Sequence, residues 1–261
     1  MNLLEEIVDN KRGEVIARQA QRPLNDLKAA ARNVALRPKF SEALRSAPIG
    51  LIAEVKRRSP SAGAIRDPFD PCAIGKACQA GGAQAISCLM DNKYFGGGED
   101  DFRAVRSAMD LPMLYKEFVV DPWQVWHARE IGASAVLLIA AALAEEDLAG
   151  LKEEVCAAGL EVLFEVHDEE EMALATRLEC EMVGINNRNL KTFETTLETT
   201  LSLRDQAPEH AVVISESGIR NAEDVALLKS EGIDGILVGE HLLRREDLKT
   251  AVHDLMGNFK P

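Results

Sequence analysis

Residues 51–61 place two opposite charges at the end of a short apolar run. Glu54 and Lys56 lie two positions apart and are followed by a serine-proline turn. Because side chains two apart on a β-strand point to the same face, the carboxylate and the ammonium would lie side by side at the end of a buried strand. An ordinary core strand has no use for such a pair, since charge is costly to bury. The pair therefore predicts a functional site.

Similar polar residues follow other apolar runs, at the points where those runs end. They are Asp91, Lys116, Glu117, Glu165, His167, Asn186, Asn187, Arg188, Ser215, Glu216 and Ser217. Each residue alone has an ordinary structural explanation, such as an ion pair, a helix cap or a filler of a packed layer. Strand interiors disfavour charge, so the joint occurrence of these residues at strand ends indicates one shared site.

The elements that must position these residues are β-rich apolar runs that alternate with helical patterns. The runs cover residues 51–55, 84–89, 112–116, 135–140, 161–166, 182–186, 211–215 and 235–238. Strands that are apolar nearly throughout and alternate with helices indicate a parallel sheet covered by helices. These units predict an α/β fold, a closed (β/α)8 TIM barrel, with its active site at the carboxyl ends of the strands. An open doubly wound sheet is the alternative.

Helical patterns complete this organisation. Between the strands they are predicted at residues 70–80, 121–131, 145–158, 221–230 and 245–256. Glycines that follow several of them fit helix C-caps, as at Gly132, Gly159 and Gly232. Apolar spacing at residues 3–15 and 24–31 predicts two more helices before the first strand. We expect one domain, residues 1–261, in which residues 1–47 form an N-terminal helical extension.

Glycines after the seventh and eighth strands indicate phosphate binding. Gly218 follows Ser217, and Gly239 precedes Glu240. These are the two loops in which TIM barrels commonly hold phosphate on backbone N–H groups, and glycine lets the backbone approach an anion closely. Gly218, Gly239 and Glu240 are therefore predicted phosphate-binding residues, with tight turns as the alternative explanation.

Composition restricts the partners of the chain. Its net charge of −13 and pI near 4.9 argue against nucleic acid or an anionic membrane surface, although a small anionic substrate is compatible if cations gather locally. Five cysteines without a Cys-x-x-Cys pair predict free thiols in a reducing cytoplasm. We expect no signal peptide, because the N-terminus is acidic, and no membrane span, because the longest apolar run, residues 133–144, is too short.

With these residues placed, the sequence resembles the indole-3-glycerol phosphate synthase family over essentially the whole chain after the first helices. The shared motifs are Ile52-Ala53-Glu54-Val55-Lys56, Ser59-Pro60-Ser61, Tyr94-Phe95-Gly96-Gly97, Lys116-x-Phe118, Glu165-Val166-His167, Gly-Ile-Asn-Asn-Arg-Asn-Leu at residues 184–190, and Glu216-Ser217-Gly218-Ile219. The resemblance implies a TIM barrel that converts 1-(2-carboxyphenylamino)-1-deoxyribulose 5-phosphate to indole-3-glycerol phosphate in tryptophan biosynthesis, releasing carbon dioxide and water. It implies no metal and no organic cofactor. Association, if any, is expected as a homo-oligomer or as a weak complex with other tryptophan-pathway enzymes.

The resemblance also implies roles for individual residues. Lys116 matches the general acid that protonates the ribulose carbonyl, and Lys56 matches the lysine that engages the substrate carboxylate and takes part in the later dehydration. Glu165 matches a proton-transferring glutamate and Glu54 an acid that orients the lysines. The other residues assigned to the catalytic set are Asn186, Glu216 and Ser217. The implied substrate-binding residues are Ser59, Phe95, Phe118, Arg188 and Leu190.

The sequence departs from the family pattern at a few positions. Met90, Ala62, Glu117 and His241 stand where threonine, lysine, aspartate and a small residue are usual. None of these departures removes a catalytic residue. Two alternatives to the synthase are a paralogous phosphate-binding barrel that acts on, or merely binds, a different ribulose phosphate, and a non-enzymatic subunit kept for metabolite binding or assembly. The complete polar set favours the enzyme.

Overall fold

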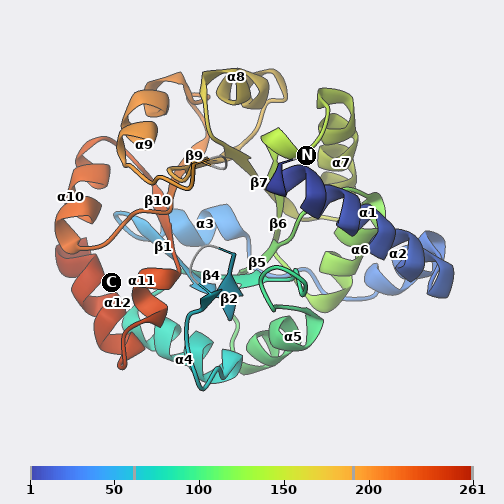
Figure 1. The fold of residues 1–261 in the computed structure, drawn as a ribbon, viewed down its shortest axis with the longest axis horizontal. Helices are drawn as coiled ribbons and strands as arrows, with labels where there is room; N and C mark the ends of the chain where they lie inside the picture. Colours follow the sequence, from blue (N-terminus) through green and yellow to red (C-terminus); the bar gives the residue numbers. More distant parts are fainter. Residues whose placement is uncertain (1, 61–62, 190–191, 260–261) are drawn as a thin grey trace.

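The computed structural model describes residues 2–60, 63–189 and 192–259, and the main strands among them form a closed parallel barrel (Figure 1). These strands are β1 (Gly50–Val55), β4 (Ala85–Leu89), β5 (Met113–Lys116), β6 (Ala135–Ile139), β7 (Glu161–Val166), β8 (Met182–Asn186), β9 (Val212–Glu216) and β10 (Gly235–Val238). Neighbours pair in sequence order, and β1 pairs with β10 as well as with β4. The predicted TIM barrel is confirmed, and the open sheet is wrong because β1 and β10 close the ring.

Helices surround the barrel on the outside. They are α4 (Pro71–Gly81), α5 (Glu99–Ala108), α6 (Pro122–Ile131), α7 (Glu145–Ala157), α8 (Glu169–Arg177), α9 (Glu198–Leu203), α10 (Ala222–Ser230), α11 (Glu240–Leu243) and α12 (Leu248–Met256), with short 3-10 turns η1 (Ala140–Ala142), η2 (Arg204–Gln206) and η3 (Gly257–Phe259). Side chains of Asp70, Asp121 and Asn221 cap α4, α6 and α10, which is why the predicted starts agree with the structure. The helix predicted from residue 245 begins later because Asp247 caps it.

Two apolar clusters hold the barrel together. The cluster inside the barrel includes Ile52, Leu114 and Ile214, together with Phe40 and Leu44 from α3 (Phe40–Arg45). The larger cluster packs the outer faces of the strands against the surrounding helices. The strands are therefore buried on both faces, which accounts for their nearly continuous apolar sequence.

The N-terminal extension contains α1 (Leu3–Gln21), α2 (Leu24–Ala31) and α3. Figure 1 shows α1 in front of the barrel and α3 behind it, and α2 packs beside α6. The predicted helical extension is thus present, and its helices reach both ends of the barrel.

A small antiparallel sheet follows β1 in the chain. It pairs β2 (Arg58–Ser59) with β3 (Gly63–Ala64). The sequence predicted only a turn there, because strands of two residues are too short for periodicity to reveal. This sheet holds Ser59 next to the end of β1.

Candidate active site

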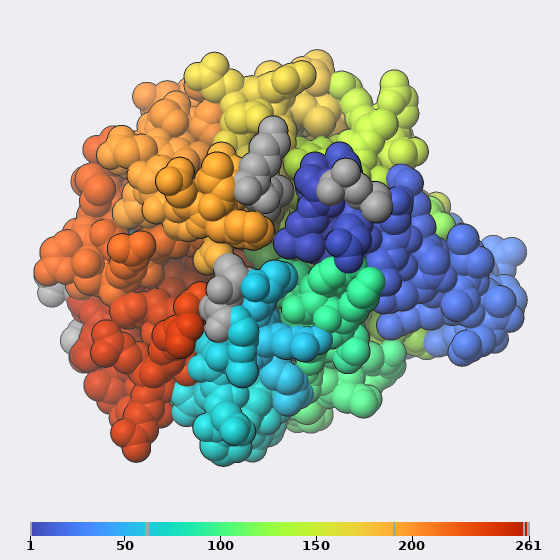
Figure 2. All heavy atoms as spheres, viewed as in Figure 1, coloured from blue at the N-terminus to red at the C-terminus, as the bar shows by residue number. Residues whose placement is uncertain are grey.

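A cavity of about 490 Å³ lies at the carboxyl ends of the barrel strands. Figure 2 shows the corresponding face of the molecule, with the N-terminal helix in blue on its right-hand side. The predicted site residues that line the cavity are Glu54, Lys56, Ser59, Phe95, Lys116, Phe118, Glu165, Asn186, Arg188, Glu216, Ser217, Gly218, Gly239 and Glu240. Leu190 lies outside the described residues. One cavity therefore brings together all the other residues predicted for catalysis, substrate binding or phosphate binding. Of the remaining strand-end residues, Glu117 also lines the cavity, whereas Asp91, His167, Asn187 and Ser215 do not.

Lys116 ends β5 and lies between two buried glutamates. Its Nζ is 2.5 Å from Glu216 Oε2 and 3.4 Å from Glu165 Oε2, and 13% of its side chain is exposed. Burial alone would lower the pKa of Lys116, but the charges of Glu216, Glu165 and Glu54 outweigh burial and raise this pKa above its ordinary value. Lys116 is therefore an ammonium that can donate a hydrogen bond or a proton to an oxygen in the cavity.

The two glutamates beside Lys116 have opposite pKa shifts. Burial raises the pKa of Glu216 to about 7, although Lys116 opposes the shift. Burial would also raise the pKa of Glu165, but Lys116, His167 and Asn186 together hold it well below its ordinary value. Glu165 is therefore a carboxylate at neutral pH, whereas Glu216 exchanges its proton there. Such a separation of pKa values gives two neighbouring acids different chemical roles.

His167 follows β7 and supports Glu165. Its Nε2 is 3.4 Å from Glu165 Oε1, and its Nδ1 is 3.0 Å from Glu171 Oε2. Burial lowers the pKa of His167, but hydrogen bonds and charges from the two glutamates raise it to about 10 overall. The imidazole is therefore protonated at neutral pH and keeps Glu165 ionised and oriented.

Glu54 and Lys56 form an ion pair on one face of the strand, as their spacing predicts. Burial would raise the pKa of Glu54, but the charges of Lys56 and Lys116 lower it overall. The Glu54 carboxylate thus interacts electrostatically with both lysines of the cavity. This arrangement links the end of β1 to the end of β5.

Two glycines make room for the buried carboxylates. A Cβ at Gly184 of β8 would overlap the Glu216 carboxylate, and a Cβ at Gly239 after β10 would overlap that of Glu54. Glycine in a strand often marks such a close approach. Gly239, predicted to hold phosphate, therefore also has a steric reason to lack a side chain.

Apolar side chains form another part of the cavity wall. The Phe95 and Phe118 rings have centroids 6.0 Å apart at a tilt of 35°. Tilted aromatic pairs of this kind attract each other beyond simple burial. Other apolar residues that line the cavity are Leu3, Leu4 and Ile7 of α1 and Leu137 and Ile139 of β6. The wall suits a flat aromatic group.

The loops after β8, β9 and β10 form a cationic side of the cavity. Arg188, Arg220 and Arg244 line it there. Arg244 Nε donates a hydrogen bond of 2.9 Å to the Glu240 carboxylate, so the opposite charges of these two side chains offset each other. Ser217 has a φ of 68°, a left-handed conformation uncommon outside glycine and often found at functional sites.

Sequence comparison decides the family. The profile described as indole-3-glycerol phosphate synthase matches residues 4–255. The chain belongs to the indole-3-glycerol phosphate synthase family. This membership confirms the predicted resemblance and the predicted enzyme class, a carboxy-lyase of tryptophan biosynthesis.

Individual relatives match over nearly their whole length. The indole-3-glycerol phosphate synthase of Rhodopirellula baltica is 45% identical over 260 residues, which cover 99% of this chain and 100% of the relative. The protein of the same name from Rhodospirillum rubrum is 44% identical over 263 residues, covering 98% and 99%. That of Kineococcus radiotolerans is 43% identical over 264 residues, covering 98% and 95%.

Solved structures of lower identity share the fold. The tryptophan synthase alpha subunit of Pyrococcus furiosus has a TM-score of 0.62 at 17% identity, covering 80% of this chain and 98% of that one. The N-acetylmannosamine-6-phosphate 2-epimerase of Clostridium perfringens has a TM-score of 0.63 at 14% identity, covering 80% and 93%. These matches support the TIM barrel alone.

Some lining residues of this synthase-family cavity were not predicted. Leu3, Leu4 and Ile7 belong to a helix that the apolar spacing did predict, but periodicity does not reveal which end of a barrel a helix covers. Arg220 and Arg244 were also missed. Their signal is a basic residue shortly after each of the two predicted phosphate-binding glycines.

The described part of the chain gives further facts on metals, membranes and thiols. Within residues 2–60, 63–189 and 192–259, no group of three or more His, Cys, Asp and Glu side chains is arranged to hold a metal ion. Over the same ranges, no helix combines the length and the apolar character needed to cross a membrane. The cysteines are free thiols, at Cys72, Cys78, Cys88, Cys156 and Cys180.

Proposed function

We propose that this cavity closes the indole ring of 1-(2-carboxyphenylamino)-1-deoxyribulose 5-phosphate and releases carbon dioxide and water to give indole-3-glycerol phosphate. Family membership supports this reaction. The cavity offers an apolar wall for the aromatic ring, buried lysines for the ketone and the carboxylate, and arginines for the phosphate. The observation that carries the proposal is the Lys116 ammonium between Glu165 and Glu216.

Lys116 is the general acid of ring closure. The aromatic carbon that bears the carboxylate attacks the ketone carbon of the ribulose chain, and negative charge develops on the ketone oxygen. The Lys116 ammonium donates its proton to this oxygen, which is the position where a buried cation stabilises the transition state most. Glu216, with its pKa of about 7 and its contact to Lys116, then returns a proton to the lysine.

Lys56 and Glu165 act on the later steps. Lys56 binds the substrate carboxylate until carbon dioxide leaves, while Glu54 holds the ammonium in place. Loss of water then needs a proton on the departing hydroxyl and removal of a proton from the new ring. Lys56 supplies the first, and the ionised Glu165 accepts the second. Both groups line the same cavity.

The remaining cavity residues position the substrate. Phe95 and Phe118 hold the aromatic ring so that the attacking carbon faces the ketone, which is the kind of orientation that lowers an activation barrier. Leu190, outside the described residues, is assigned to substrate binding on its motif alone. Hydroxyl and anionic groups of the substrate are assigned to Ser59, Asn186, Arg188 and Ser217, and the phosphate to Gly218, Gly239 and Glu240, with Arg220 and Arg244 beside them.

The reaction is tested by supplying the substrate to the purified protein and following indole fluorescence. We expect turnover without added metal or organic cofactor. Folded protein that gives no indole-3-glycerol phosphate would contradict the proposal. A thermal-shift comparison with phosphorylated sugars decides the alternative, because a paralogue with a different task would bind a ribulose phosphate that lacks the anthranilate ring more tightly.

We also propose that the enzyme works in the cytoplasm, alone or as a homo-oligomer or weak complex with other tryptophan-pathway enzymes. The free cysteines are compatible with a reducing compartment. Light scattering coupled to size exclusion measures the oligomeric state. Cell fractionation tests the compartment.

A further inference from the structure

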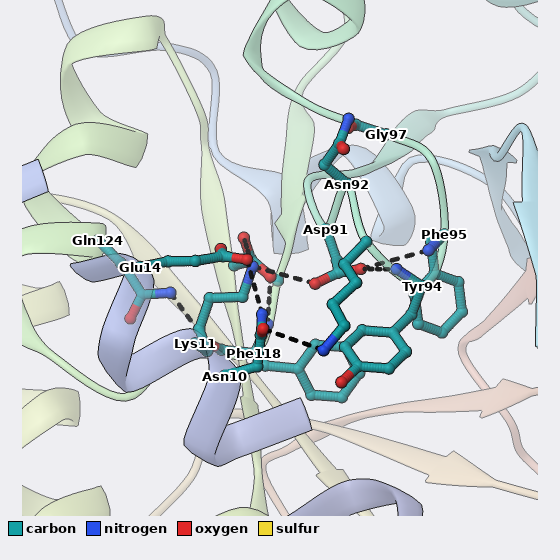
Figure 3. Close-up of polar contacts among 12 residues, drawn as sticks. Asn10, Lys11, Glu14, Asp91, Asn92, Tyr94, Phe95, Gly97, Phe118 and Gln124 are labelled. Carbon is teal, nitrogen blue, oxygen red and sulfur yellow. Dashed lines mark hydrogen bonds and ion pairs between the residues drawn. The ribbon is translucent and has the colours of Figure 1, made fainter. Parts of the chain in front are cut away.

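A further buried lysine lies on α1 and does not line the cavity. Lys11 is 2% exposed. Its Nζ is 2.8 Å from Glu14 Oε2, 3.1 Å from Asp91 Oδ2 and 3.1 Å from Glu117 Oε2. Figure 3 shows Lys11 directed towards Glu14 and Asp91. We call these four residues the Lys11 cluster.

Two carboxylates of the Lys11 cluster belong to the loops that carry the aromatic wall. Asp91 follows β4, and its Oδ1 accepts a hydrogen bond of 3.2 Å from the backbone N–H of Phe95. Glu117 follows β5, and its Oε1 accepts one of 2.9 Å from the backbone N–H of Phe118. Each carboxylate therefore uses one oxygen for the backbone of an aromatic residue and the other for Lys11. The ammonium joins the two loops.

The Lys11 cluster also adjoins the general acid. Lys116 and Glu117 are consecutive, and their side chains leave the end of β5 in different directions, Lys116 towards Glu216 and Glu117 towards Lys11. Asp91 and Glu117 are 0% and 4% exposed, so water does not screen their charges well. Without the ammonium, these two buried acids would have no cation between them. Their mutual repulsion, or protonation of Glu117, whose pKa burial already raises to about 7, would then break the link between the two loops.

We propose that Lys11 is a positioning residue for ring closure and acts through Asp91 and Glu117. By joining their loops it holds the Phe95 and Phe118 rings, and the strand end that bears the general acid, in the geometry that the substrate requires. The inference rests on the proposed function. It gives the N-terminal helix a part in the reaction in addition to covering the cavity.

The test compares two substitutions that remove ion pairs of the N-terminal extension, one in α1 and one at its C-cap. Lys11→Met removes the ammonium but keeps an unbranched side chain of similar length, and we expect kcat/KM per folded molecule to fall roughly 100-fold, mainly in kcat. Arg22→Met removes the Arg22–Glu130 pair, which has N–O distances of 2.6 and 2.7 Å and lies away from the cavity residues. This control should lower Tm but leave kcat and KM within twofold of the wild type, roughly the scatter of such measurements.

The outcomes separate the two proposals. A folded wild type without turnover would defeat the proposed function itself. An active wild type with a Lys11→Met variant of unchanged kcat and KM would overturn the positioning role and leave Lys11 as a helix anchor. If Lys11→Met does not fold, the Glu117→Gln variant tests the positioning role instead. It keeps an oxygen that can accept the Phe118 N–H and removes the carboxylate charge that faces Lys11. We expect this variant to lose roughly tenfold in kcat/KM, and an unchanged value would overturn the inference.

Discussion

Two buried lysines near the same strand end, Lys11 and Lys116, have similar surroundings and different access. Each lies among carboxylates, and in each case these carboxylates outweigh burial and raise the pKa of the lysine. Lys116 is 13% exposed and lines the cavity, whereas Lys11 is 2% exposed and lies on the buried face of α1. A buried ammonium with acidic partners is therefore not in itself a catalytic group. Access to the substrate distinguishes the proton donor from the residue that holds loops in place.

The first prediction concerns Lys116, the lysine that lines the cavity. Lys116→Met should lower kcat roughly 10³-fold, because it removes the proposed proton donor to the ketone oxygen. Indole fluorescence at saturating substrate measures the change. Lys76 on α4 is exposed and serves as a control, since Lys76→Met should leave kcat unchanged. A kcat for Lys116→Met within tenfold of the wild type would remove Lys116 from its role.

The second prediction disturbs a partner of Lys116 without changing any charge. Gly184→Ala places a Cβ where Oε1 of Glu216 lies, so the carboxylate that contacts Lys116 through its other oxygen must shift. We expect kcat/KM to fall roughly 10²-fold, as for other small displacements of catalytic groups. Gly150→Ala in α7 is the matched control, because its Cβ would meet no atom within 4 Å. Equal kcat/KM values for the two variants would show that Glu216 does not need this position.

The third prediction uses pH to test the charge network formed by Lys116, Glu165 and His167. The pKa of His167 is raised from 6.5 to about 10 in the folded chain, so the stabilisation from its charge is full below pH 6.5 and is lost as pH rises through 10. The free energy of unfolding should fall by roughly a few kcal/mol in total, because each pH unit between the two pKa values contributes about 1.4 kcal/mol. Urea unfolding should show stability falling over this range in the wild type and much less in His167→Asn. Parallel pH profiles would contradict the assignment.

The smallest predicted effect concerns the helix that carries Lys11. A Cβ at Gly13 in α1 would meet no atom within 4 Å. Gly13→Ala should therefore increase the free energy of unfolding by about 0.5–1 kcal/mol, since alanine is the better helix former. Urea unfolding measures this change, and kcat/KM should stay constant. A changed kcat/KM would mean that helix stability, and not the Lys11 contacts alone, affects the reaction.

Much of the barrel, and much of the set of cavity residues around Lys116, could be predicted from the sequence. Apolar runs of strand length alternate with capped helices, and these local signals determine where each strand ends. The alternation of side chains then placed Glu54 beside Lys56. The direction in which the pKa of Lys116 moves could not be predicted, because burial and the charges of three glutamates oppose each other and their balance depends on distances.

The Lys11 cluster could not be predicted from the sequence, for a different reason. Lys11 and Glu117 are 106 positions apart, and a lysine in an amphipathic helix usually lies at the surface. Only the packing of α1 across the barrel brings the two together. The glutamate at position 117 departs from the family pattern, but the sequence does not reveal its partner, because the contact depends on the tertiary structure.

The most direct test of the different access of the two lysines is chemical rescue by small amines. Lys116→Ala leaves a gap that opens to the cavity, so added methylammonium or ethylammonium should restore ring closure in proportion to its concentration. Lys11→Ala leaves a gap that is sealed between α1 and the barrel. The same amines should therefore not restore the activity that this variant loses. Wild-type turnover by Lys116→Ala without amine, or equal rescue of both variants, would contradict the account.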